Sequence, residues 1–488
     1  MDLPNLTDQV DGLPNLSGDE ATVTKVAREA ADHPVYGDRS PIRLTEIDSA
    51  FAVALHMHQP LIPAAGEQLT SAGIIGNLQW MLEHPDIGDN HNASVFRWCY
   101  QRAADLVSGL LEQGRTPRLM LDYSGTLLHG LRQMGADDVL GNLRRLTNEP
   151  ELAQCVEWLG CPWGHAVAPS TPVQDFRLHV LAWQQHFAAL FGWAALERVR
   201  GFSPAEMALP NHPDVAYEFV RTLVDSGFTW VLVQEHTVEL IDGRGLEHRH
   251  LPHRLVCTNS AGDSAEIVAV IKTQGSDTKL VGQMQPYYEA RTLTPVQLAG
   301  RRIPPLVTQI ADGENGGVMM NEFPGKYQQA INECSGSRTP AMNVTEYLEQ
   351  VFATGLRPAD LPTAQPVGQH RIWQEIQPGD GPQRLAGAID ALRAADDRFH
   401  VEGGSWTGDI SWVKGYDNVL APMERASVAF HERVTSRGVS TADPLYRRAL
   451  FHLLSAQTSC YRYWGQGLWT DYGAEMSRRV IATTEEIG

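Results

Sequence analysis

Two short segments place carboxylates where an enzyme with a parallel barrel keeps its chemistry. Glu206 lies in the segment RVRGFSPAEMALP (198–210), directly after a short apolar run and between two prolines. A charge in apolar surroundings is costly unless it is paired or used. Asp312 opens the segment DGENGG (312–317), after another apolar run. Two carboxyl groups held close together can cleave a glycosidic bond with retention, one as nucleophile and the other as general acid and base.

Further polar and aromatic residues follow other apolar runs. His56 and His58 in HMHQP (56–60) are two residues apart, so an extended chain turns both rings to one side. Imidazole nitrogens can bind sugar hydroxyls, and indoles offer flat apolar faces to sugar rings. The remaining candidates for substrate binding are Gln59, Glu157, Trp163, His165, Ser203, Gln234, His236, Glu314, Trp406, Trp412 and Trp464.

The same residues also fit other chemistries. His56, His58 and His236, with an aspartate after the last strand, resemble the ligand set of a metal-dependent hydrolase or deacetylase. A third possibility is a catalytically silent protein that binds glucan. Composition does not separate these alternatives.

The elements that would position these residues alternate between strand and helix. Seven β-rich runs are expected to be strands: 51–55, 118–121, 155–159, 199–201, 230–233, 267–271 and 306–310. Helical patterns cover 95–112, 168–191, 214–226 and 295–300 between or beside them. Such alternation is typical of parallel strands, and seven of them predict an α/β fold, a (β/α)7 barrel. The carboxyl ends of its strands would carry the site.

The pattern changes along the chain and suggests three parts. Residues 1–47 are a polar N-terminal extension, expected to lie over the body or to be partly mobile. Residues 48–330 form the catalytic barrel, with a rim insertion at about 237–288. Residues 331–488 form a C-terminal helical region, with amphipathic patterns at 344–355, 384–397, 421–437 and 444–459.

Composition excludes several classes of partner. The 488-residue chain has 39 Lys and Arg against 58 Asp and Glu, a net charge of −19, which argues against nucleic acids and anionic membranes. No apolar run approaches the length of a membrane span, and the N-terminus does not resemble a secretory signal. Six scattered cysteines without a C-x-x-C pair are expected to be reduced, mostly core thiols of a cytoplasmic protein.

Taken in order, these motifs resemble glycoside hydrolase family 57. HMHQP (56–60) is similar to the first conserved region of that family, and EWLGCPWGHAVAP (157–169) resembles the second. GFSPAE (201–206) resembles the third, and DGENGG (312–317) resembles the fourth. The segment 275–283 resembles a stretch between the third and fourth regions. The Trp-rich segments 405–412 and 459–464 fall where the fifth would be. The resemblance covers about residues 50–470.

The resemblance implies a (β/α)7 barrel, retention of anomeric configuration, no required cofactor, and an α-glucan or related α-linked oligosaccharide as substrate. It implies that Glu206 is the nucleophile and Asp312 the general acid and base, with Asp277 as the less favoured alternative. Ser203, Gly316 and Cys460 depart from the family pattern, where tryptophan, a bulky aromatic and aspartate are usual. These departures leave the sugar, the linkage, and the choice between hydrolysis and transfer open. Oligomeric state is also open.

Overall fold

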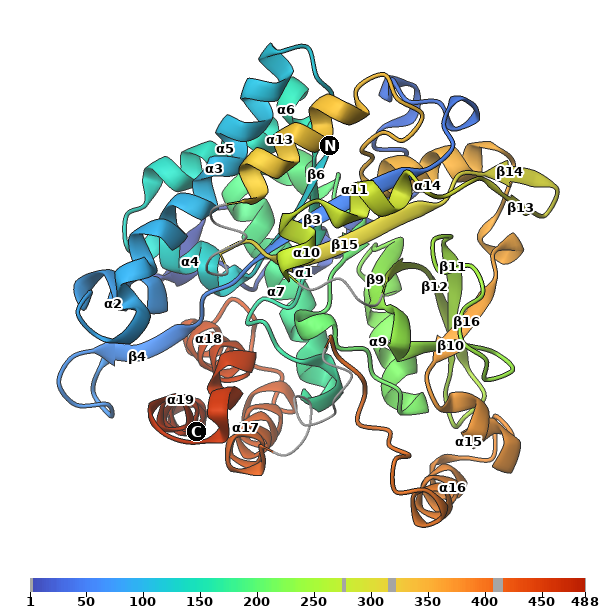
Figure 1. Cartoon of the computed structure of the whole chain (residues 1–488). Helices are drawn as coiled ribbons and strands as arrows, with labels where there is room; N and C mark the ends of the chain where they lie inside the picture. Colours follow the sequence, from blue (N-terminus) through green and yellow to red (C-terminus); the bar gives the residue numbers. More distant parts are fainter. Residues whose placement is uncertain (1–2, 274–277, 315–321, 407–415, 488) are drawn as a thin grey trace.

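A computed structural model describes residues 3–273, 278–314, 322–406 and 416–487. Its centre is a closed barrel of parallel strands (Figure 1). Around the barrel the order is β12 (Ser264–Lys272), β15 (Leu306–Asp312), β3 (Ala50–Met57), β6 (Leu119–Tyr123), β7 (Val156–Gly160), β8 (Gly201–Phe202) and β9 (Trp230–Gln234). Strand β9 pairs back to β12 and closes the ring. The predicted (β/α)7 barrel is confirmed.

Strand β3 shows how the sequence builds two layers. Its residues Ala50, Ala52 and Ala54 belong to the cluster inside the barrel, and the residues between them belong to the larger cluster under the surrounding helices. Successive side chains of a strand point to opposite faces, so this period of two buries both faces. The alanines leave room inside for large side chains such as Trp230, which is fully buried.

Helices pack around the barrel and over its ends (Figure 1). They are α2 (Asn77–Glu83), α3 (Ala93–Glu112), α4 (Gly125–Gln133), α5 (Asp137–Asn148), α6 (Pro150–Cys155), α7 (Val173–Phe191), α8 (Trp193–Leu196), α9 (Pro213–Asp225), α10 (Thr278–Gly282), α11 (Gln285–Ala290), α13 (Phe323–Cys334) and α14 (Val344–Ala353). A small hairpin of β4 (Leu61–Ala65) and β5 (Gly73–Gly76) follows β3. The prediction of a helix at 295–300 is wrong. That segment forms a hairpin of β13 (Val296–Leu298) and β14 (Arg301–Ile303).

A second lobe extends the barrel sheet at β12. The first half of β12 pairs antiparallel with β11 (His253–Thr258), and its second half pairs with β9. Strand β16 (Thr363–Pro366) joins β11 to β10 (Val238–Leu240), and α15 (Gln369–Glu375) and α16 (Pro382–Ala395) follow it. The rim insertion expected at 237–288 therefore shares its sheet with a segment from 363–366, which was expected to belong to the helical region.

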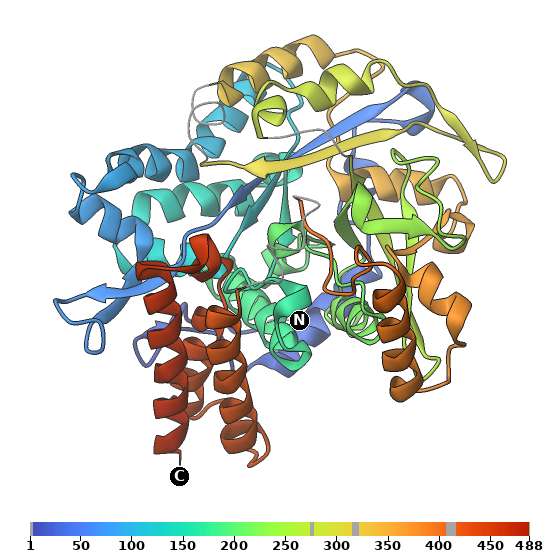
Figure 2. The same ribbon diagram turned by 60° about the horizontal axis from the view of Figure 1, so that its bottom comes forward.

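The last helices form a separate bundle of α17 (Asp417–Phe430), α18 (Pro444–Ala456) and α19 (Leu468–Glu486). Figure 2 shows this bundle and α16 on opposite sides of the molecule. The N-terminal extension is folded, with β1 (Gln9–Val10), β2 (Leu13–Pro14) and α1 (Glu20–Ala31), and α1 packs on α7. All six cysteines are buried thiols that form no disulfide. In the described ranges, no helix has the length and apolarity needed to cross a bilayer.

Candidate active site

Three neighbouring strands end in a row of acid, imidazole and acid. Asp312 of β15 is the register partner of His56 on β3, and His56 is the partner of Asp122 on β6. His56 Nδ1 lies 2.9 Å from Asp122 Oδ2. Neighbours in the register of parallel strands point to the same side. The carboxyl ends of three barrel strands therefore place His56 between two aspartates.

These carboxylates set the charge of His56. Burial disfavours the imidazolium, but the neighbouring carboxyl groups together outweigh burial, Asp122 first and then Asp312 and Glu314, and the pKa of His56 is raised to about 10. His56 is therefore a cation at neutral pH. Its Nε2 is buried and has no hydrogen-bond partner within the described ranges. A protonated imidazole with one occupied and one open N–H can donate to an oxygen of a bound ligand.

Two further imidazoles stack beside it. The ring centroids of His58 and His165 are 4.0 Å apart, and those of His56 and His165 are 4.6 Å apart. His58 Nδ1 contacts Ser124 Oγ at 2.7 Å, and His165 Nδ1 contacts Ser459 Oγ at 2.8 Å. Burial, followed by the neighbouring imidazoles, holds the pKa of both rings well below the usual value. Both rings are therefore neutral beside the cationic His56.

Glu206 reaches this cluster from the turn after β8. Its Oε1 lies 3.9 Å from His165 Nδ1, and its Oε2 accepts a 2.9 Å hydrogen bond from Trp406 Nε1. Burial and then the charge of Asp312 raise the pKa of Glu206, while His56, Ser459 and Trp406 oppose that rise. Glu206 and Asp312, the predicted pair, thus both border the histidine cluster. Glu206 lies beside His165, and Asp312 is the register neighbour of His56.

Glu314 is a further carboxyl group of this cluster whose pKa is strongly raised. Its Oε1 accepts a 2.9 Å hydrogen bond from the His58 backbone N–H, and its Oε2 is buried without a partner in the described chain. Burial, and next the charge of Asp312, raise the pKa of Glu314 to about 8. Glu314 therefore carries a proton at neutral pH.

Several residues that contribute to the site were not predicted from the sequence. Asp122 follows the predicted strand 118–121 directly, so the rule applied to the other strand ends would have found it. Ser459 and Arg462 come from the C-terminal region. The Arg462 side chain is buried, and its Nη1 donates to Ser170 Oγ at 2.7 Å. Its Nε and Nη2 have no partner in the described part of the chain, and burial lowers the pKa of Arg462 to about 10 against the attraction of Glu206.

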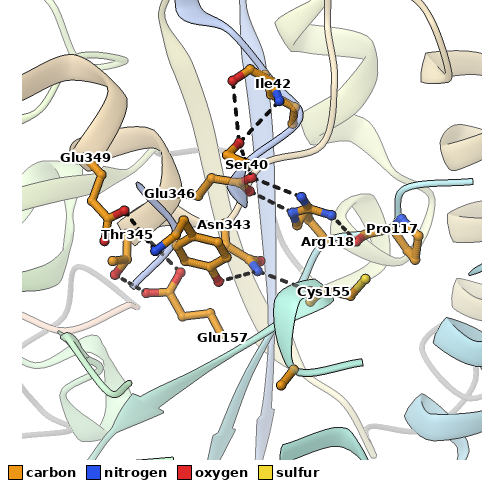
Figure 3. A network of polar contacts seen from close by, with 12 residues as sticks. Ser40, Ile42, Pro117, Arg118, Cys155, Glu157, Asn343, Thr345, Glu346 and Glu349 are labelled. Atoms are coloured by element: carbon orange, nitrogen blue, oxygen red, sulfur yellow. Dashed lines mark hydrogen bonds and ion pairs between the residues drawn. The ribbon is translucent and has the colours of Figure 1, made fainter. Parts of the chain in front are cut away.

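Two predicted residues are not brought to the site. Glu157 lies on β7, where its register partner on β6 is Met120. Asp122, which contacts His56, lies two residues further along β6, so Glu157 lies deeper in the barrel. It accepts hydrogen bonds from the hydroxyl and backbone N–H of Thr345, in the polar network beneath the barrel (Figure 3). Trp163 is fully buried, and its Nε1 donates to His186 Nδ1 at 3.2 Å. In the described residues, the side chains of Glu157 and Trp163 therefore make their hydrogen bonds within the protein core.

The other predicted residues lie at or near the strand ends. Gln59 accepts from Asn77 Nδ2 at 2.8 Å, and His236 Nε2 contacts the Ser405 carbonyl at 2.7 Å. Ser203 and Gln234 are buried directly after β8 and at the end of β9. The ring of Trp406 is exposed, beside Glu206. Outside the described residues or side chains lie Trp412, Trp464, Asp277 and Gly316.

The described residues contain no cluster of side chains suited to binding a metal ion. There, no group of three or more His, Cys, Asp and Glu side chains is arranged to hold an ion. His236, which the metal hypothesis would pair with His56 and His58, is bonded to a backbone carbonyl, and burial lowers its pKa.

Comparison with known proteins adds information on the fold. No protein-family model and no curated protein sequence matches the chain. The solved 4-alpha-glucanotransferase from Thermococcus litoralis has a TM-score of 0.54 at 15% identity, over 90% of this chain and 60% of that one. The chain has the fold of this enzyme. The GH57-type branching enzyme from Pyrococcus horikoshii has a TM-score of 0.52 at 13% identity, over 89% of this chain and 88% of that one.

Proposed function

We propose that this chain is a divergent member of glycoside hydrolase family 57 that cleaves or transfers α-glycosidic linkages with retention. The observation that carries the proposal is the row of Asp312, the cationic His56 and Asp122 at the carboxyl ends of the barrel strands. Glu206 borders this row, because its carboxylate lies 3.9 Å from Nδ1 of His165, whose ring stacks on His56. Its support from known proteins is the fold shared with a 4-alpha-glucanotransferase and a GH57-type branching enzyme. A shared fold alone does not fix an activity, so the site carries the argument.

In the first step, an oxygen of Glu206 forms a bond to the anomeric carbon as the glycosidic bond breaks. Asp312 acts here in its protonated form and gives that proton to the departing oxygen. In the second step Asp312 takes a proton from water or from a sugar hydroxyl, and that oxygen replaces Glu206. Water gives hydrolysis, whereas a sugar hydroxyl gives transfer.

The surrounding residues act on charge and position. His56 donates from Nε2 to an oxygen of the sugar and offsets the negative charge of the ionised Glu206. The hydrogen bond from Trp406 holds Glu206 in place and favours its ionised form. Glu314 stays neutral beside Asp312, so it adds no further charge to the site. His165 is neutral, and its buried Nε2, which has no partner in the described residues, is suited to binding a hydroxyl, whereas both nitrogens of His58 already contact protein side chains.

The test is product analysis of purified protein on maltooligosaccharides, amylose and other α-linked disaccharides. Redistributed chain lengths identify a transferase, and new reducing ends alone identify a hydrolase. Glu206→Gln and Asp312→Asn are expected to remain folded and to lose turnover. Glu235→Gln is the matched control, because Glu235 also follows a barrel strand but pairs with Arg249 at 3.4 Å. Products formed by Glu206→Gln at the normal rate would overturn the assignment, and folded protein silent on every substrate would overturn the substrate class.

A further inference from the structure

A cavity lies at the opposite end of the barrel from Glu206 and Asp312. Its volume is about 680 Å³, within the range of small-molecule sites. One wall is the N-terminal extension, from α1 to residue 39. The other wall is the segment from Trp193 to Arg200, which leads into the first residue of β8. The extension therefore encloses a space against the amino-terminal end of the barrel.

The cavity is positively charged in a protein that is strongly negative. Four cations line it, Lys25, Arg39, Arg198 and Arg200, against the two acids Glu29 and Glu197. The chain as a whole carries a net charge of −19. A local excess of positive charge in an acidic protein attracts anions to that place.

The arginines of the cavity are held by backbone carbonyls. Arg198 donates to the Ala153 carbonyl, Arg39 to the Val35 carbonyl, and Arg200 to the Glu197 carbonyl at 2.6 Å. Within the described ranges, none of the three forms an ion pair with a carboxylate. A carbonyl fixes a guanidinium without neutralising it, and a guanidinium has five N–H donors. In Arg39 and Arg198 the bond to the carbonyl comes from Nη2, so other N–H groups of each guanidinium can donate to a ligand.

We propose that this cavity is a binding site for an organic phosphate. Guanidinium groups bind phosphate oxygens with paired, charge-assisted hydrogen bonds. Lys25 stands on α1 across the cavity from Arg198, so a phosphate between them would contact the extension and the barrel together. Trp193 offers the organic part of the ligand a half-buried indole face, held by a 2.9 Å hydrogen bond from its Nε1 to the Pro4 carbonyl.

The wall of the cavity is tied to the floor of the barrel. The backbone N–H groups of Tyr36 and Gly37 donate to Glu349 at 2.9 and 2.8 Å, and Asn343 donates to the Tyr36 hydroxyl at 2.9 Å. Figure 3 shows Asn343 and Glu349 in one network with Glu157 and Thr345. A ligand that orders residues 33–39 would therefore also stabilise this network.

The experiment measures binding directly by isothermal titration calorimetry on the full chain. The probes are pyrophosphate, glucose 1-phosphate and ADP, with glucose as the neutral control. Saturable binding is expected for at least one organic phosphate and not for glucose. Binding of pyrophosphate without binding of either organic phosphate would overturn the assignment of an organic ligand, whereas preference for glucose 1-phosphate or ADP would identify a sugar or a base as the organic part.

Variants locate the site. Lys25→Gln with Arg39→Gln is expected to weaken binding at least about tenfold, and Arg39→Lys less. Arg398→Gln, at an arginine whose side chain is 89% exposed and outside the cavity, is the matched control. Absence of saturable binding at millimolar concentration, or binding unchanged in the folded double variant, would overturn the proposal. Glu206→Gln should bind the phosphate as the unmodified protein does, so this result is independent of the proposed reaction.

Discussion

Glu206 and His165 approach within 3.9 Å of each other, and both have left-handed backbone conformations, with φ of 58° and 57°. Residues other than glycine adopt this region at a cost, and they do so where the surrounding structure requires it. Two hydrogen bonds link these turns to the C-terminal region, from Trp406 N–H to the Glu206 carbonyl and from Ser459 N–H to the His165 carbonyl. The nucleophile candidate and its neighbour are thus held by segments far away in sequence.

Trp406→Phe should raise the pKa of Glu206, because it removes the donor that favours the ionised carboxylate. Since the ionised form is the nucleophile, the acidic limb of kcat/KM should move to higher pH, with a loss of about tenfold below that limb. The measurement is a pH–rate profile on the substrate found by product analysis. Trp98→Phe, at another exposed tryptophan, is the control. An unchanged acidic limb would show that Trp406 does not tune Glu206.

Asp122→Asn should lower the pKa of His56, since burial then acts with less opposition. His56 is protonated below its pKa of about 10 in the unmodified protein, so the variant should lose the cation as pH rises through a lower value. We expect kcat/KM to fall about 100-fold at neutral pH and to recover in part on acidification. NMR titration of His56 checks the cause. Asp138→Asn, at a surface ion pair with Arg97, should change neither quantity.

Glu157→Gln should change how stability depends on pH. Burial raises the pKa of Glu157 to about 7 from 4.5, against the hydrogen bonds from Thr345. The folded state then holds a proton that the unfolded state releases, so stability is full below about pH 4.5 and falls as pH rises to about 7, by roughly 3 kcal/mol. The variant should lack this part of the slope in denaturant unfolding measured from pH 5 to 8. Glu149→Gln, at an exposed site, should keep it, and equal slopes in all three proteins would contradict the prediction.

Gly164→Ala should destabilise the fold and displace His165. A Cβ at Gly164 would lie 2.1 Å from the Leu454 carbonyl oxygen, a backbone atom of α18 that cannot move alone. We expect a loss of about 2 kcal/mol or more in the free energy of unfolding. Gly141→Ala is the control, because nothing lies within 4 Å of the added carbon in α5, and it should stabilise by roughly 0.5–1 kcal/mol. Equal thermal midpoints for the two variants would count against the close contact.

The barrel could be predicted from the sequence because its strands are short apolar runs with clear ends. All seven expected runs overlap or adjoin the observed strands, and the weakest, 199–201, shares only Gly201 with β8. The segment 295–300 was predicted as a helix and instead contributes β13 of a hairpin, because its few apolar residues fit either period. Strand β16 was missed because its pairing with β10 and β11 depends on partners far away in sequence.

Part of the candidate site could be predicted from the sequence for a similar reason. His56, His58, Glu206 and Asp312 each follow an apolar run, so strand ends alone select them. Glu157 also lies in such a run, but only the strand register shows that it lies lower in the barrel. Arg462 could not be found, since a single sequence does not show that the turn after α18 reaches Ser170 and Glu206.

The closure of the barrel has a consequence for the order of folding. Strand β3, the first of the ring to be synthesised, needs β15 on one side, and Ala50 pairs with Leu306. The ribosome must therefore complete most of the barrel before its first strand gains its second neighbour, and loop closure over such a distance slows folding. Until then one edge of β3 remains open to strands of other chains. We expect nascent chains that end before β15 to depend on chaperones, and those that extend past Asp312 to become resistant to proteases.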